Sequence, residues 1–218
     1  MSLSLHLNIL PAAQLKLWPL LKDVPKEFIL YGGTAVALQL GHRISVDFDF
    51  FSDLPLNREK LITQFSLLQQ YHLVQPEINT IDCIADFPEG PVKLQFLADL
   101  AQRQKRIELP IIAKDNKLQI ASLRDLFATK LNTIQHRAEC KDYLDINAII
   151  KSGISLAEGL GCAVAVYGKT FDPASSLRAL CSYRDGNLNE LDEEIRSYLS
   201  QQAAAVENIP VISCYSAT

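Results

Sequence analysis

Asp47 and Asp49 are the residues of this chain best suited to chemistry. They stand in the segment Val46 to Phe51, VDFDFF, where apolar and acidic residues alternate as they do on a strand. Val46, Phe48 and Phe50 are expected to point one way, so the two carboxylates share the other face, roughly 6.6 Å apart along the backbone. Carboxylates this close repel each other unless a cation lies between them. Mg²⁺ is commonly held by one or two carboxylates and substrate phosphates, so the pair predicts an Mg²⁺ or Mn²⁺ site.

A glycine turn precedes this strand. Residues 28–31 are apolar and predict a short buried strand, and Gly32 and Gly33 then allow the backbone to turn tightly and to approach a ligand. Thr34 is expected to cap a helix over 35–40. Backbone N–H groups at a helix N-terminus bind phosphate, so the turn and the acidic strand together predict phosphoryl or nucleotidyl transfer. The simpler interpretation, a glycine turn before two surface aspartates, does not explain an acidic face flanked by phenylalanines.

A second group of charged residues lies in two helices expected after Ser122. Ser122 is a good N-cap for a helix to about His136, and a second helix is expected from Lys141. Lys130 is predicted to lie at the rim of a cleft, on the same helix face as Arg137. Two acidic residues, Asp142 and Asp145, share the polar face of the second helix. Without the first motif, solvated surface charges would be the better interpretation of this pair of helices.

These motifs resemble a known family. The segment YGGTAVALQLGHRISVDFDFF is similar to the first motif of the nucleotidyltransferase superfamily, and GGTA, HRIS and DFDFF resemble the AbiEii/AbiGii toxin family, which includes the MenT toxins. The later family motifs, a lysine followed by an arginine and then [KR]-D-x-x-D, match in order. The matching positions are Lys130, Arg137, Lys141, Asp142 and Asp145.

The resemblance implies a metal-dependent nucleotidyltransferase that moves an NMP from an NTP to a hydroxyl of RNA, tRNA among the candidates, or of protein. Asp47 and Asp49 would bind the metal, and with Lys130, Asp142 and Asp145 they would form the catalytic set. It also implies a toxin with a cognate antitoxin. Arg43 would meet a phosphate or pair with a carboxylate of the metal strand. The residues expected to bind nucleotide are Gly32, Gly33, Thr34, Arg43, Ser45, Arg137 and Lys141.

Gln95 departs from the family pattern. The superfamily usually places a third carboxylate on a later strand, and here the matching strand, VKLQFL, presents Gln95 at that position. An amide is a weaker metal ligand, which favours an alternative to full activity: a catalytically weakened module that binds nucleotide and regulates. A third interpretation, less favoured, is a hydrolase or kinase that moves a phosphoryl group from the same cleft.

Residues elsewhere must form the elements that position these groups. Two further strands, about 80–87 and 92–98, are joined by a Pro-Glu-Gly-Pro turn, and the chain after 121 reads as helices. The predicted fold is α+β (mixed α/β): a nucleotidyltransferase-like small mixed sheet with flanking helices over 1–120. A helical subdomain over 121–218 is expected to close the active-site cleft.

Composition limits the other possibilities. The 218 residues are 48% hydrophobic and 21% charged, which is typical of a globular protein with a sizeable core. A net charge of −4 argues against a surface that binds nucleic acid everywhere, though a local basic cleft is compatible with it. Five cysteines without a paired motif suggest reduced thiols, hence a cytoplasmic protein. No apolar run approaches a membrane span, so no membrane partner is expected.

Overall fold

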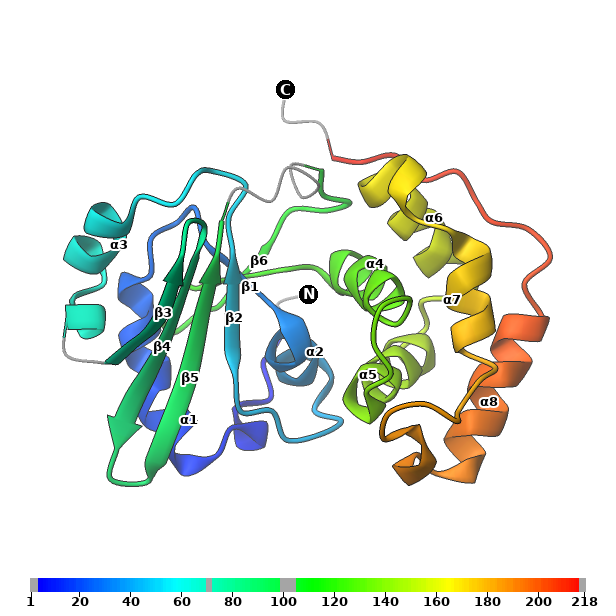
Figure 1. The fold of residues 1–218 in the computed structure, drawn as a ribbon, viewed down its shortest axis with the longest axis horizontal. Coiled ribbons are helices and arrows are strands. Elements are labelled where there is room, and N and C mark those ends of the chain that lie inside the picture. The colour runs from blue at the N-terminus through cyan, green and yellow to red at the C-terminus, as the bar shows by residue number, and fades with distance from the viewer. Residues whose placement is uncertain (1–3, 70–71, 99–104, 216–218) are drawn as a thin grey trace. The chain divides into compact units, whose positions relative to one another are not determined.

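We describe the protein from a computed structural model, over residues 4–69, 72–98 and 105–215. The chain divides into two compact units (Figure 1). The first consists of Met1–Gln104 and Pro110–Ala121, and the second of Lys105–Leu109 and Ser122–Thr218. In the part of the chain that the structure describes, all strands belong to the first unit.

A mixed sheet forms the centre of the first unit. Its strands are β1 (Ile29–Tyr31), β2 (Phe48–Phe51), β3 (His72–Glu77), β4 (Thr80–Phe87), β5 (Gly90–Leu97), β6 (Ile111–Ile112) and β7 (Gln119–Ile120). The order across the described sheet is β3-β4-β5-β2-β1-β7-β6. The β2·β5 and β1·β7 pairs are parallel and the others antiparallel. This mixed sheet with helices confirms the predicted α+β class and the hairpin of β4 and β5.

The core of the first unit lies against one face of this sheet. Phe48 and Phe50 of β2 and Phe96 of β5 are fully buried. The Phe50 and Phe96 rings stack with their centroids 4.9 Å apart. Because side chains alternate along a strand, burying these phenylalanines places Asp49 and its strand neighbour Gln95 on the opposite face. The apolar half of the VDFDFF pattern therefore orients Asp49.

The helices divide between the two units. The first unit has α1 (Ala12–Leu17), α2 (Gly32–Leu40) and α3 (Arg58–Gln64), with 3-10 turns at Leu7–Ile9, Trp18–Asp23 and Ser66–Gln69. The second has α4 (Leu123–Thr133), α5 (Cys140–Lys151), α6 (Leu156–Tyr167), α7 (Pro173–Ala179) and α8 (Glu193–Ala204), with 3-10 turns at Gly168–Thr170 and Leu188–Glu190. Ser122 caps α4 by accepting the backbone N–H of Asp125, as predicted.

The acidic strand is shorter than predicted, because two of its expected residues bond elsewhere. It begins at Phe48 rather than at Val46. The carbonyl of Val46 accepts a hydrogen bond from the Gln14 amide at 2.9 Å, and the carbonyl of Asp47 accepts one from the Thr34 hydroxyl. Val46 is 49% exposed, unlike Phe48 and Phe50, which are fully buried, so the prediction that the strand begins at Val46 is wrong.

The helix after the glycine turn begins earlier than predicted. It starts at Gly32 rather than at Ala35, and its N-cap is Tyr31, which makes no side-chain cap bond. Thr34 therefore lies inside the first turn of α2, and its hydroxyl bonds to the loop before β2 instead of capping the helix. Gly32 makes the early start possible because its φ of +71° is a conformation that glycine adopts without strain.

Among the described residues, no single helix has the length and apolar composition needed to span a membrane. Cys140–Lys151 and Leu156–Thr170 meet that test only when taken together, and they are bent by 115° at the break between them.

Close packing of α4 on α6 generates a stability prediction. A Cβ added to Gly159 of α6 would overlap the ring of the buried Phe127 in α4. Alanine favours a helix over glycine by about 1 kcal/mol, but overpacking a core costs about 1–3 kcal/mol. We expect Gly159→Ala to lower the free energy of unfolding in urea. Val164→Ala, at a position of α6 that is 40% exposed, is the control and should change it by less than about 0.5 kcal/mol. A Gly159→Ala protein more stable than the parent would contradict this packing.

Candidate active site

Asp49 lies on β2 between two strand neighbours. It pairs with Tyr31 of β1 on one side and with Gln95 of β5 on the other. Its side chain is half-buried, on the face opposite the phenylalanine core. Asp47 immediately precedes the strand and is also half-buried. Both side chains are thus partly exposed, at the start of a strand that the sheet holds in place.

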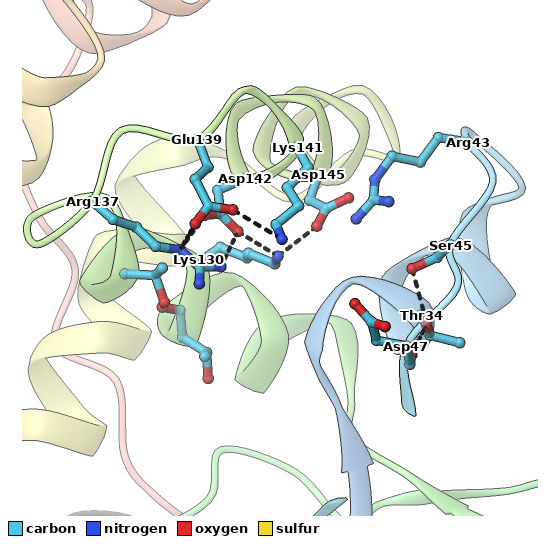
Figure 2. Close-up of polar contacts among 12 residues, drawn as sticks. Thr34, Arg43, Ser45, Asp47, Lys130, Arg137, Glu139, Lys141, Asp142 and Asp145 are labelled. Carbon is cyan, nitrogen blue, oxygen red and sulfur yellow. Dashed lines mark hydrogen bonds and ion pairs between the residues drawn. The ribbon is translucent and has the colours of Figure 1, made fainter. Parts of the chain in front are cut away.

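The loop before β2 is held by side chains of α1 and α2. Gln14 donates to the carbonyl of Val46, and Thr34 donates to the carbonyl of Asp47. The Thr34 and Ser45 hydroxyl oxygens lie 2.8 Å apart and share a second hydrogen bond (Figure 2). Thr34 is 1% exposed and Ser45 8%. Their hydroxyls therefore position Asp47, while any contact of this turn with a phosphate would come from the backbone.

Gly32 brings the start of α2 against the Asp49 side chain. A Cβ at this position would overlap the Oδ2 atom of Asp49. The carboxylate thus lies beside the first turn of a helix whose N-cap provides no side-chain acceptor. A helix N-terminus favours negative charge, so this turn suits the phosphates of a ligand whose cation Asp49 binds.

The carboxylates of this site suit one hard cation whose remaining ligands come from water and substrate. The described residues contain no group of three or more histidine, cysteine, aspartate or glutamate side chains that could hold a metal ion. Asp47 and Asp49 supply two carboxylates, which is the usual protein share of an Mg²⁺ site completed by water and phosphate. The close fit of Asp49 over Gly32 keeps one of them in place. These residues therefore fit Mg²⁺ or Mn²⁺ whose remaining ligands are waters or nucleotide phosphates.

Arg43 belongs to the same loop. Its Nη1 donates to the carbonyl of Ile44 at 3.0 Å, which bends the side chain back along its own backbone. The neighbouring Ile44 side chain is 67% exposed. Sequence analysis offered a phosphate or a carboxylate as the Arg43 partner, and both remain predictions.

The second charged group is a buried ion cluster (Figure 2). Lys130 of α4 donates to Oδ1 of Asp142 at 2.7 Å and lies 2.6 Å from Oδ2 of Asp145, both in α5. The side chain of Lys130 is 5% exposed and those of the two aspartates 0%. The prediction that Lys130 lies at a rim is wrong, and so is the alternative of solvated surface charges. Two carboxylates out of water need a cation between them, which is why Lys130 is buried.

Arg137 completes the charge balance of this cluster. Its Nε donates to Oδ2 of Asp142 at 2.8 Å, while its side chain stays 46% exposed. Burial raises the pKa of Asp142, but Lys130 and Arg137 lower it by more, so the pKa lies below its usual value. The two cations match the two carboxylates. Arg137 also lies 3.5 Å from Glu139, which pairs with Lys141 at 2.9 Å. Lys141 is 51% exposed and is therefore joined to the cluster through Glu139, at its edge.

The structure thus brings the predicted residues together in two sets. Gly32, Thr34, Ser45, Asp47 and Asp49 form the first, in the first unit, with Arg43 on the same loop. Lys130, Arg137, Asp142 and Asp145 form the second, in the second unit. The predicted closeness of Lys130 to Asp47 and Asp49 concerns residues of different units and stays a prediction.

Sequence reasoning missed the role of Gln14. This glutamine is 4% exposed on α1, next to the buried Ala13 and near the buried Leu17. A polar residue on the apolar side of a helix needs a hydrogen-bond partner, and that pattern was the available signal. The identity of the partner, the carbonyl of Val46, depends on a contact between residues far apart in the sequence.

Comparisons with known proteins identify the family and agree with the fold. Residues 21–210 match the family model of the AbiEii toxin, a nucleotidyl transferase of type IV toxin–antitoxin systems. An uncharacterized protein of Aquifex aeolicus is 27% identical over 175 residues, covering 79% of this chain and 81% of that protein. Two solved structures have a similar fold. One is MenT4, a nucleotidyltransferase toxin of Mycobacterium tuberculosis (TM-score 0.61, 15% identity, 89% of this chain and 82% of that one). The other is a candidate nucleotidyltransferase of H. pylori (TM-score 0.57, 18% identity, 91% and 92%).

The fit of Asp49 over Gly32 yields a prediction about stability. Gly32→Ala should lower the free energy of unfolding through both backbone strain and the overlap with Asp49, by about 1–3 kcal/mol. Adding Asp49→Ala removes the overlap, so the double variant should lose less than the sum of the two single changes in urea unfolding. Gly168→Ala, with φ of +58° and open space around the added Cβ, is the control for backbone strain alone. Strict additivity of Gly32→Ala and Asp49→Ala would show that the two residues do not touch.

The buried cluster yields a second prediction. Lys130→Met removes the cation between two fully buried carboxylates and should lower the free energy of unfolding by about 3–5 kcal/mol. Lys141→Met is the matched control, because that lysine is half-exposed and contacts only the half-exposed Glu139 among the ion pairs of the described residues. It should cost at most about 1 kcal/mol. Equal unfolding midpoints for the two variants would refute a structural role for Lys130.

Proposed function

The chain belongs to the AbiEii nucleotidyltransferase toxin family, and on this basis we propose that it transfers an NMP from an NTP to a hydroxyl group in a metal-dependent reaction. The observation that carries the proposal is the placement of Asp47 and Asp49 beside the first turn of α2. An acidic pair next to a helix N-terminus can hold a divalent cation and the phosphates bound to it. Kinases and NTP hydrolases need the same two features, so the choice of nucleotidyl transfer among these reactions rests on the family.

The proposed reaction is an in-line displacement at the α-phosphorus of the NTP. The acceptor hydroxyl oxygen forms a bond to this phosphorus, the bond to pyrophosphate breaks, and the hydroxyl proton passes to solvent. Mg²⁺ or Mn²⁺, when bound, neutralises charge on the phosphates and on the leaving pyrophosphate. Asp47 and Asp49 bind the cation. The backbone of Gly33 and Thr34 orients the phosphates, and the buried Thr34 and Ser45 hydroxyls keep Asp47 in place.

The order of the family motifs supports a part for the second unit in the same reaction. We propose that Arg137 and Lys141, whose side chains are 46% and 51% exposed, contact nucleotide phosphates. Lys130, Asp142 and Asp145 form the remainder of the proposed catalytic set. Their burial indicates that they act by holding Arg137, since Asp142 binds both Lys130 and Arg137. The helical unit would then form one wall of the nucleotide cleft.

The partners follow from the same premise. A toxin of a type IV toxin–antitoxin family has an antitoxin, and its substrate is an NTP. We propose an RNA hydroxyl as acceptor, with tRNA as one candidate, or a protein hydroxyl. Both acceptors and the antitoxin are cytoplasmic molecules, and the proposal places the protein with them.

Gln95 favours a second candidate function. An amide stands beside Asp49 where the superfamily usually has a carboxylate, and its side chain is bonded to Asp82 instead of being open. A chain with this change would bind the metal–nucleotide complex and regulate without turnover. Both candidate functions include binding of the metal–nucleotide complex. They differ only in whether the NMP is then transferred from the nucleotide to an acceptor.

The test uses purified full-length protein, Mg²⁺ or Mn²⁺, each NTP in turn and total RNA. Label from α-labelled NTP should appear on RNA or on a protein, and label from γ-labelled NTP should appear in pyrophosphate. Transfer of the γ-label would indicate a kinase, and its release as phosphate a hydrolase. Nucleotide binding without any transfer would favour the regulatory module.

We expect Asp47→Asn and Asp49→Asn each to abolish metal-dependent nucleotide binding and label transfer, because each removes a charged ligand from an otherwise intact sheet. Calorimetry with Mg²⁺ and nucleotide measures the binding. Asp86→Asn, at an exposed acid of β4, is the control and should behave as the parent does. If Asp47→Asn or Asp49→Asn bound the metal–nucleotide complex as the parent does, the proposal that these residues bind the cation would be wrong.

A further inference from the structure

Three polar side chains form a row across neighbouring strands of the first unit. Asp49 of β2 pairs with Gln95 of β5, and Gln95 pairs with Asp82 of β4. Directly paired residues on adjacent strands point to the same face, with their strands roughly 4.8 Å apart. The fully buried residues on either side of the row, Phe48 with Leu94 and Phe50 with Phe96, face the core. The row therefore begins at the proposed metal site and extends two strands away from it.

Gln95 is the donor and Asp82 the acceptor of a hydrogen bond within this row. Nε2 of Gln95 donates to Oδ1 of Asp82 at 2.7 Å. A glutamine side chain has one donor end and one acceptor end, and an ionised carboxylate only accepts. Asp82 therefore selects the amide orientation in which the NH₂ end is bonded to it. The acceptor end, Oε1, is the end left for the Asp49 side of the row.

Asp82 has no strong competing partner among the described ion pairs. The Lys93 ammonium is 3.9 Å from its Oδ2, at the limit for an ion pair, and both side chains are partly exposed, at 47% and 27%. Such a surface pair is worth little. The shorter and better defined contact of Asp82 is the one with Gln95, so the main effect of this carboxylate is on the orientation of the amide.

We propose that Gln95 contributes its carbonyl oxygen to the divalent-cation site of Asp47 and Asp49, and that Asp82 is the positioning residue that holds this oxygen toward the site. Amide carbonyls are accepted oxygen ligands of hard cations, directly or through a bound water. The inference rests on the proposed function, because it presumes a cation on Asp47 and Asp49. It explains how a chain with an amide in place of a carboxylate retains a third oxygen.

A double-mutant cycle with Mn²⁺ alone as the probe tests the proposal. Free Mn²⁺ is measured by electron paramagnetic resonance during titration of the full-length protein, so the readout is independent of activity. Loss of a partner that orients a metal ligand typically lowers affinity 10–100-fold. We expect Asp82→Asn and Gln95→Ala each to weaken Mn²⁺ binding about tenfold. The double variant should be no weaker than Gln95→Ala, because Asp82 acts only through the amide.

Asp86→Asn is the matched control. Asp86 lies on the same face of β4 as Asp82, four residues further along, and pairs with Pro91 instead of Gln95. Its replacement removes the same charge without touching the amide and should leave Mn²⁺ affinity unchanged. Circular dichroism and thermal unfolding without metal confirm that each variant is folded. If Asp82→Asn is poorly folded, Asp82→Ala provides the second test of the same cycle.

The outcomes separate this inference from the proposed function. Equal Mn²⁺ affinity of Asp82→Asn and Asp86→Asn would overturn the inference while Asp47→Asn still weakens binding. Additive losses of Asp82→Asn and Gln95→Ala would overturn it too, because Asp82 would then act by its charge alone. A parent protein that binds no Mn²⁺, or binds it as tightly after Asp47→Asn, would overturn both the inference and the metal site on which it rests.

Discussion

The pairing of Tyr31 with Asp49 is the constraint on which the candidate site depends. Because β1 and β2 are antiparallel, the residue after Tyr31 comes directly beside the Asp49 side chain. That residue must lack a Cβ and must adopt a positive φ, and Gly32 does both. The first turn of α2 is thereby fixed against a carboxylate of β2, and the Thr34 hydroxyl of the same turn reaches the carbonyl of Asp47. Strand register thus places the helix N-terminus at the acidic pair.

The acidic residues of the two units differ in burial and in the groups around them. In the second unit, Asp142 and Asp145 are fully buried, and Lys130 and Arg137 balance their charge within the fold. In the first unit, Asp47 and Asp49 are half-buried beside a helix N-terminus, and the cation that best complements them belongs to the proposed substrate complex. A buried cluster with matched charges contributes rigidity, whereas half-buried carboxylates beside a helix N-terminus are accessible to a ligand. This difference in burial is the reason for the different roles proposed for the two sets of residues.

The sequence patterns that predicted elements correctly depend on interactions between residues close together in the chain. The alternation of VDFDFF placed Phe48 and Phe50 in the core, and the Ser122 cap set the start of α4. The bounds that were wrong involve partners from elsewhere in the chain. Val46 and Asp47 leave the strand because Gln14 and Thr34 bind their carbonyls, and no periodicity within the segment contains that information. Lys130 was predicted at a rim because the apolar stripes of the two helices were expected to pack inward and leave it there, and only contact with α5 made its burial favourable.

The sequence by itself determined the α+β class, the family, the acidic pair and the order of the motifs, because each of these is written in residue types and short spacings. Tertiary structure alone decided which carboxylates are fully buried with cations and which stay partly exposed. It placed Lys130 between Asp142 and Asp145, bonded Gln95 to Asp82, and set Gly32 over Asp49. The physical reason is that the cost of a charge or a Cβ depends on the groups around it, and those groups come from distant parts of the chain.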